Sequence, residues 1–175
     1  GEKNTKPFIF STKIKIKFKT WYKVWISYHY NTSTIQLGQV VLNKKVNKIN
    51  STIKSTKCFK RHFLNYNLPL IFAALGNKNA INHFNGKLES PQIHNKTINV
   101  KSANQFISKS NQYTPIMEWD FSKKIKTAHI VDIGKHKYNG QLFNLPTRGM
   151  TGSNWSGKEM NWNHLPGEYG AIHFH

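Results

Sequence analysis

Cysteine, arginine and acidic residues are scarce in this sequence of 175 residues, and each scarcity makes certain classes of function less expected. The single cysteine, Cys58, cannot form an internal disulfide, so nothing indicates an oxidising compartment and we expect a cytoplasmic protein. Cys58 lies in a lysine-rich stretch with no evident partner residue, which gives no support to a catalytic nucleophile. No apolar run is long enough to span a bilayer, so we expect no membrane partner.

The few acidic residues leave a formal net charge of +19 and a sequence pI of about 10.1. Such a charge usually indicates nucleic acid or an anionic membrane as a partner. Arginine, which suits bidentate contacts with phosphate and guanine, occurs only as Arg61 and Arg148. The lysines come with an excess of Asn and Ile, the joint signature of an A/T-rich coding sequence. We therefore expect nucleic acid not to be a partner.

Short segments with the period-two alternation of β-strands recur along the chain. Residues 12–21 alternate Ile or Phe with lysine, the pattern of a half-buried strand with a lysine-coated face. Residues 21–42 predict two strands joined by a polar turn at Asn31–Thr34, with aromatic side chains on both faces. Further strands are expected at 68–75 and 116–122.

Two stretches lack a strand pattern. Residues 43–67 are polar and lysine-rich and predict a long variable loop, and residues 95–114 predict a short helix or a loop. Hydrophobic residues make up 38% of the chain, which is enough for a real core. Many short strands, turn signals between them and no convincing amphipathic helix together predict an all-β sandwich.

Glu118 and Asp120 stand two apart, hence on one face of a predicted strand. Laminarinase-type glucanases carry a Glu-x-Asp-x-x-Glu pattern on such a strand, but Lys123 occupies the position of the second Glu. A retaining glycosidase needs two carboxyl groups about 5–5.5 Å apart. With one of them missing, we expect Asp120 to cap or brace the following turn.

Histidines suggest two further candidates. His129, Asp132 and His136 stand close in sequence, but Asp132-Ile133-Gly134 is more simply a turn, and a metal site needs three or four converging ligands. His173 and His175 would point to the same side of a strand, a spacing able to chelate one metal or line one site. Two ligands alone are insufficient, so we keep them only as weak candidates for a site in a larger protein.

Three motifs mark the last third of the chain: WDFS (119–122), VDIGKHKYNGQLFNLPTRGMTGSNW (131–155) and YGAIHFH (169–175). From Trp119 to His175 the chain thereby resembles the large (β) subunit of the N,N-dimethylformamidases. WYKVWISYHYNTSTIQLGQ (21–39) and HFNGKLESPQI (83–93) are similar to the lectin module inside that subunit. The string NLPTRGMTGSNW is fairly specific for this family, whereas many lectin-like sandwiches contain segments similar to HFNGKLESPQI.

The resemblance implies an all-β fold, a concanavalin A-like (laminin-G-like) jelly-roll β-sandwich over residues 1–142. Residues 143–175 would form a linker and the start of a following catalytic domain. In that linker Pro146 would stiffen the chain, Gly149 and Gly152 would permit tight turns, and Arg148 and Trp155 would anchor it against neighbouring surfaces. An ordinary structured C-terminal loop explains the same residues equally well.

By the same resemblance, the parent enzyme hydrolyses dimethylformamide to dimethylamine and formate. Its mononuclear iron is held by tyrosine and glutamate side chains of the domain that follows the lectin-like module. The chain stops at His175, so we expect no catalytic residue, no metal and no cofactor in it. Its partners would be the catalytic domain of the same chain and other enzyme subunits. The alternative to a module of an enzyme subunit is a free-standing carbohydrate-binding module.

Overall fold

The computed structural model describes residues 10–42, 52–57, 69–75, 81–97, 112–144, 146–153 and 171–174. Every regular element in these ranges is a β-strand, which confirms the all-β prediction. None of them forms a helix of the length and hydropathy that crossing a membrane requires. The chain divides into unit 1 (Gly1–His62 and Thr97–Gln112) and unit 2 (Phe63–Lys96 and Tyr113–His175).

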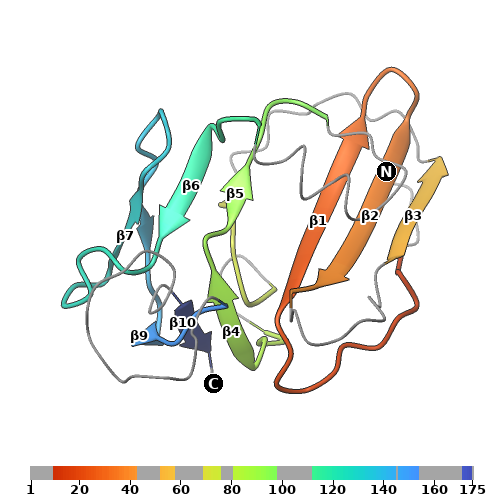
Figure 1. Ribbon diagram of the computed structural model, residues 1–175. Coiled ribbons are helices and arrows are strands. Elements are labelled where there is room, and N and C mark those ends of the chain that lie inside the picture. The colour runs from red at the N-terminus through yellow and green to blue at the C-terminus, as the bar shows by residue number, and fades with distance from the viewer. Residues whose placement is uncertain are drawn as a thin grey trace, which may run out of the picture. The chain divides into compact units, whose positions relative to one another are not determined.

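Unit 1 contains one antiparallel sheet of three strands, in the order β1-β2-β3 (Figure 1). The strands are β1 (Tyr22–His29), β2 (Thr34–Val41) and β3 (Thr52–Lys57). The predicted hairpin over residues 21–42 is confirmed, because β1 and β2 pair from Tyr22 opposite Val41 to His29 opposite Thr34. The Ser33 amide donates to the Tyr30 carbonyl at 3.1 Å and closes the connecting turn.

One face of this hairpin is organised by Trp25. Trp25 lies opposite Gly38, and a Cβ added at Gly38 would come within 2.1 Å of Trp25 Cζ2. The indole therefore covers the glycine directly, a position that only a residue without a side chain permits. Val40 is buried on the same face, because residues two apart on a strand share a face.

Two predictions for unit 1 are wrong. Residues 12–21 do not form a strand, since Lys13 and Lys19 have positive φ angles of 61° and 53° that interrupt an extended path. Phe18 is 99% exposed, so the alternating apolar side chains do not define a buried face. The expected loop over 43–67 contains β3, which pairs with β2 along its whole length. Pairing to an existing hairpin compensates for the weak pattern of its sequence TIKSTK.

Unit 2 contains two sheets (Figure 1). The first has three antiparallel strands in the order β4-β10-β9, namely β4 (Gly86–Glu89), β10 (Ala171–Phe174) and β9 (Thr147–Met150). The second has four in the order β5-β6-β7-β8, namely β5 (Gln92–Ile93), β6 (Met117–Asp120), β7 (His129–Asp132) and β8 (Gly140–Gln141). The strand predicted at 116–122 is confirmed by β6.

The core of unit 2 draws on both sheets. Trp119, Phe121 and Ile130 come from β6, β7 and the turn between them, and the fully buried Ile172 comes from the middle of β10. Partly buried hydrophobic residues surround this cluster: Leu88, Ile93, Met117, Leu142 and Phe174. Burying apolar surface from two sheets in one cluster stabilises unit 2 as a layered β structure.

The strand predicted at 68–75 is wrong. Within the described part, 69–75, Leu75 forms a single bridge with Ile81, and several of the apolar side chains are exposed. Phe72 packs edge-on against Trp119 with ring centroids 5.3 Å apart. The described part of the apolar run therefore contributes one partly exposed aromatic contact to Trp119 and no strand. Most of the helix or loop expected at 95–114 lies outside the described residues.

The boundary predicted after residue 142 stays a prediction. β9 and β10 follow that boundary in sequence, and they form one sheet with β4, which precedes it.

Candidate functional site

An irregularity in β9 determines where Arg148 points. β10 pairs Ala171 with Met150 and His173 with Thr147, so two residues of β9, Arg148 and Gly149, face one residue of β10. This is a β-bulge, which breaks the alternation of side chains and can re-aim one of them. Gly149 has a φ of 66°, the left-handed conformation that glycine adopts without a Cβ penalty. The glycine expected to permit a tight turn thus supports a bulge inside a strand.

The guanidinium of Arg148 gathers the backbone carbonyls of the turn between β6 and β7. Its Nε donates to Phe121 O at 3.2 Å, and its second terminal nitrogen donates to Phe121 O at 2.9 Å and to Lys123 O. The other terminal nitrogen donates to the carbonyls of Lys124, Thr127 and His129 at 3.0–3.1 Å. One side chain from β9 thereby holds a turn that lies some twenty residues earlier.

This arrangement uses the whole donor capacity of the side chain. A guanidinium has five N–H groups and no acceptor, and all three nitrogens of Arg148 are directed at carbonyls. Burial lowers the pKa of Arg148, and the nearby charge of Asp120 opposes that effect. Arginine stays protonated in proteins at neutral pH. Arg148 is therefore a structural clamp with no donor left for a ligand.

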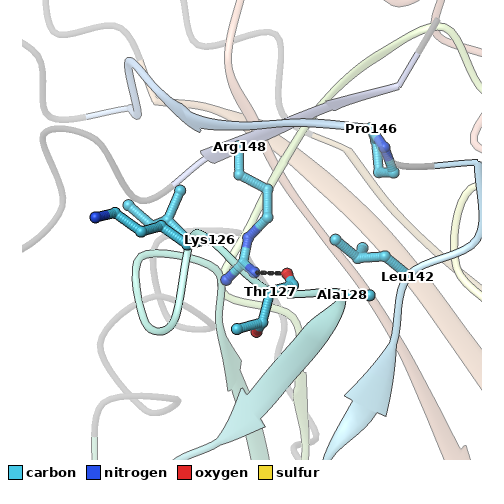
Figure 2. A pocket seen from close by; sticks show the side chains of 7 residues that line it. Lys126, Thr127, Ala128, Leu142, Pro146 and Arg148 are labelled. Carbon is cyan, nitrogen blue, oxygen red and sulfur yellow. Dashed lines mark hydrogen bonds between the residues drawn. The ribbon is translucent and has the colours of Figure 1, made fainter.

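A pocket of about 240 Å³ lies beside this clamp (Figure 2). Its lining residues are Ile125, Lys126, Thr127, Ala128, Leu142, Pro146 and Arg148. Figure 2 shows Arg148 pointing towards Thr127, with Leu142 and Pro146 on the other side. Small-molecule sites usually occupy about 300–1,000 Å³ and carry several convergent polar groups. Here the walls are largely apolar and the guanidinium is fully engaged, so the pocket does not assemble a catalytic constellation.

Asp132 forms the second polar centre of unit 2. The residue is 0% exposed, and its Oδ1 accepts the amides of Glu118 at 2.8 Å and Gly134 at 2.7 Å. Its Oδ2 accepts the amide of Tyr138 at 2.8 Å. Burial disfavours the charged form, but these backbone donors and the charge of Lys137 together lower the pKa of Asp132 below its ordinary value. The interpretation of Asp132-Ile133-Gly134 as a turn is confirmed.

The Asp132 carboxylate fixes a loop that exposes an aromatic pair. The rings of His136 and Tyr138 stack with centroids 5.5 Å apart. The Tyr138 carbonyl accepts the indole N–H of Trp119 at 2.9 Å, and the side chain of Tyr138 is exposed. Gly134 sits where a Cβ would lie 2.8 Å from both Ile116 O and Met117 Cα, so the loop passes close to the neighbouring backbone. Loops held on a rigid scaffold in this way often carry binding residues.

The carboxylates of β6 have separate structural partners. Asp120 Oδ1 accepts the amide of Ser122 at 2.8 Å and its hydroxyl at 2.5 Å, so Asp120 braces the following turn as predicted. Glu118 Oε1 accepts the side-chain amide of Gln92 at 2.9 Å across the β5–β6 pair. These three hydrogen bonds give the two carboxylates separate structural roles.

The remaining site candidates are distributed over unit 2 and the undescribed ranges. His173 is half-buried on β10, between Lys87 of β4 and Thr147 of β9. Lys87 donates its Nζ to Thr151 Oγ1 at 2.8 Å, so a cation stands beside the imidazole. His175, Trp155 and Cys58 lie outside the described residues, and their predicted roles stay predictions. Whether Arg148 also meets a following domain stays a prediction as well.

No three His, Cys, Asp or Glu side chains come together as metal ligands in the described ranges. The expectation that this chain holds no iron and no catalytic residue stays a prediction.

Sequence reasoning missed most of the pocket lining and the clamp. Lys126, Ala128 and Leu142 carry no motif that would identify them. The detectable signal for the clamp was the Arg148-Gly149 pair in a chain with so few arginines.

The comparisons with known proteins support the resemblance seen in the motifs. No family model matches the chain. It is 36% identical over 110 residues to a protein named N,N-dimethylformamidase beta subunit from Paracoccus aminophilus, covering 59% of this chain and 14% of that protein. It is 36% identical over 121 residues to a protein of the same name from Alcaligenes sp, covering 61% of this chain and 16% of that protein. The chain thus spans less than a fifth of the length of these curated relatives.

Proposed function

We propose that this chain is a non-catalytic, lectin-like β module of an N,N-dimethylformamidase-type beta subunit. The observation that carries the proposal is the 36% identity to two such subunits over about 60% of the chain. A concanavalin A-like jelly roll is the finer form of the fold that we propose for the module. Its partners would be the remainder of the beta subunit and the other subunits of the enzyme.

The geometry of unit 2 supports a scaffolding role. Unit 2 has two polar centres, Arg148 and Asp132. Arg148 donates its hydrogen bonds to backbone carbonyls of a neighbouring turn, and Asp132 accepts hydrogen bonds from backbone amides. Such internally satisfied networks rigidify a structure and leave little reactivity for chemistry. The iron that the family resemblance implies would then be held by residues outside this chain, and amide hydrolysis would occur there.

The experiment is a chimera with the Paracoccus aminophilus beta subunit, in which this chain replaces the matching segment. We expect the chimera to retain dimethylformamide hydrolysis within about tenfold of the parent in kcat/KM, because no transition-state contact is exchanged. A deletion of the same segment should lose assembly or activity. The isolated chain, supplied with iron, should release no dimethylamine.

Two outcomes would contradict this proposal. Hydrolysis by the isolated chain would place catalytic groups within it. A chimera that is folded and assembled but inactive would show that this segment contributes more than scaffolding.

A free-standing carbohydrate-binding module is the second candidate, favoured by the stacked His136–Tyr138 pair on its fixed loop. Exposed aromatic rings can pack against the apolar face of a sugar while polar groups at the rim bind its hydroxyls. Binding of the isolated chain to a polysaccharide, lost in a Tyr138→Ala variant, would favour this candidate. A chain that binds no polysaccharide would leave the first proposal in place.

A further inference from the structure

The positive charge of the chain is concentrated in unit 1. Sixteen of the 26 lysines and arginines lie in unit 1 together with one acidic residue, Glu2, so its formal net charge is +15. Unit 2 has ten basic and six acidic residues and a formal net charge of +4. A coding bias acting on the whole chain would not by itself remove acidic residues from one unit. Charge asymmetry of this kind is a sign of a charged partner.

Unit 1 also exposes apolar side chains on one face of its sheet. Val24 is 61% exposed and Ile26 is 71% exposed, two residues apart on β1. Ile26 lies opposite Leu37 of β2, and Leu37 lies opposite Lys54 of β3, so these side chains form one row across the face. Leu37 is half-buried and extends the apolar surface inward from β1.

Lysines border this apolar row on two sides. Lys54 ends the row on β3, and four exposed lysines, Lys13, Lys15, Lys17 and Lys19, precede β1. Two hydrogen bonds attach the segment before β1 to the same face. Thr12 Oγ1 donates to Gln39 Oε1 at 2.9 Å, and the Lys17 amide donates to Tyr22 Oη at 3.0 Å. Gln39 lies opposite Val24, so the lysines stand at the edge of the apolar surface.

We propose that this surface, the lysine-rimmed face, docks an acidic polypeptide whose apolar side chains cover Val24 and Ile26. The charge complementarity selects the partner. A second copy of unit 1 would bring another +15 to the contact and be repelled. Unit 2, with its own net positive charge, offers no complementary field.

The exposed side chains favour a polypeptide over nucleic acid. Base binding on a sheet relies on aromatic platforms and on arginine, whereas this row presents aliphatic Val24 and Ile26. Aliphatic side chains gain free energy mainly by burial against other apolar groups. In a segment that alternates acidic and apolar residues, the apolar side chains can face the row while the carboxylates on the outer side remain free to meet the long lysine side chains at the rim.

The test uses the full chain and a short labelled peptide alternating glutamate with leucine, measured by fluorescence anisotropy at physiological salt. Comparison probes are a lysine–leucine peptide, a glutamate–serine peptide, a single-stranded oligonucleotide and vesicles of anionic phospholipid. We expect the glutamate–leucine peptide to bind most tightly. The double variant Val24→Thr/Ile26→Thr keeps β-branched residues at exposed positions and should weaken this binding at least about tenfold.

Two further variants separate the contributions. Ile133→Thr removes an exposed isoleucine from unit 2 and should leave the affinity unchanged. Replacing Lys13, Lys15, Lys17 and Lys19 with glutamine should lower the affinity at low salt and flatten its dependence on salt, because exposed charges are screened. Circular dichroism of each variant should match that of the parent chain.

The proposal is wrong if the double threonine variant, folded as judged by circular dichroism, binds the peptide as the parent does. It is equally wrong if the oligonucleotide or the vesicles bind more tightly than the glutamate–leucine peptide. A serine-containing acidic peptide that binds as well as the leucine one would also refute it, because the apolar row would then have no role. All these measurements use this chain alone, so they are independent of amide hydrolysis.

Discussion

Removing the Arg148 guanidinium should loosen the turn between β6 and β7. Arg148→Met keeps the length and apolar stem of the side chain but leaves five carbonyl oxygens without their donor. The Phe121 carbonyl belongs to a buried residue and accepts two of the hydrogen bonds from Arg148. Leaving this carbonyl without a donor should cost about 1–3 kcal/mol. The other four carbonyls belong to exposed residues where water can replace the donor, and together they should add about 1 kcal/mol.

The expected loss for Arg148→Met is therefore about 2–4 kcal/mol in the free energy of unfolding of unit 2. Arg148→Lys should recover less than about half of it, because one ammonium with three donors cannot reach carbonyls spread from Phe121 to His129. Hydrogen exchange measured by mass spectrometry is the suitable assay, since it reports on unit 2 separately from unit 1. Amides of residues 117–132 that open with unit 2 should exchange at least about thirtyfold faster in Arg148→Met.

Lys126→Met is the matched control. Lys126 lines the same pocket with an exposed side chain, so its loss should change the exchange of these amides by less than about twofold. The clamp interpretation fails if Arg148→Met exchanges like the control, or if Arg148→Lys behaves like the parent chain. The second result would mean that charge alone, and not the fork of donors, holds the turn.

Three other substitutions test the glycines and the buried carboxylate. The lowered pKa of Asp132 means that its stabilisation is fully present above its unfolded pKa of about 3.9 and is lost as the pH falls through the folded pKa. Asp132→Asn should therefore destabilise unit 2 by about 2 kcal/mol at neutral pH, with the difference narrowing on acidification in urea unfolding; a constant difference would contradict the role of its charge. Gly134→Ala should cost about 2 kcal/mol or more, because its Cβ would meet backbone atoms of Ile116 and Met117 that cannot move aside; a stability equal to that of the parent would contradict this close approach. Gly38→Val should displace the Trp25 ring and shift its fluorescence towards the red, and an unchanged spectrum would show that the indole does not lie on Gly38.

The strands that could be predicted from the sequence are those whose pattern and turn agree locally. Residues 21–42 carry alternation on both sides of a polar turn, and the predicted hairpin forms there. The strand at Met117–Asp120 and the bracing role of Asp120 follow from the same kind of local information. The turn that joins the two hairpin strands is local, and the Ser122 amide and hydroxyl that donate to Asp120 lie two residues from it, so the local sequence carries these signals.

Elsewhere the local pattern was insufficient or misleading. Residues 12–21 alternate strictly, but the structure gives them no strand partner in its described part, and Lys13 and Lys19 have positive φ angles. β3 has a weak pattern and forms because β2 offers it a complete edge. Strand formation depends on cross-strand neighbours as much as on propensity, and these neighbours are not visible in a window of sequence.

By itself the sequence determined the all-β class, the net positive charge, the scarcity of arginine and the 36% identity to two N,N-dimethylformamidase beta subunits. Only the tertiary structure decided what Arg148 and Asp132 do. Arg148 bonds to carbonyls up to 27 residues away, and it reaches them through a bulge that exists because β9 pairs out of register with β10. Asp132 collects amides from two sides of a turn. Backbone carbonyls and amides carry no residue identity, so their convergence on one side chain arises only when the chain has folded.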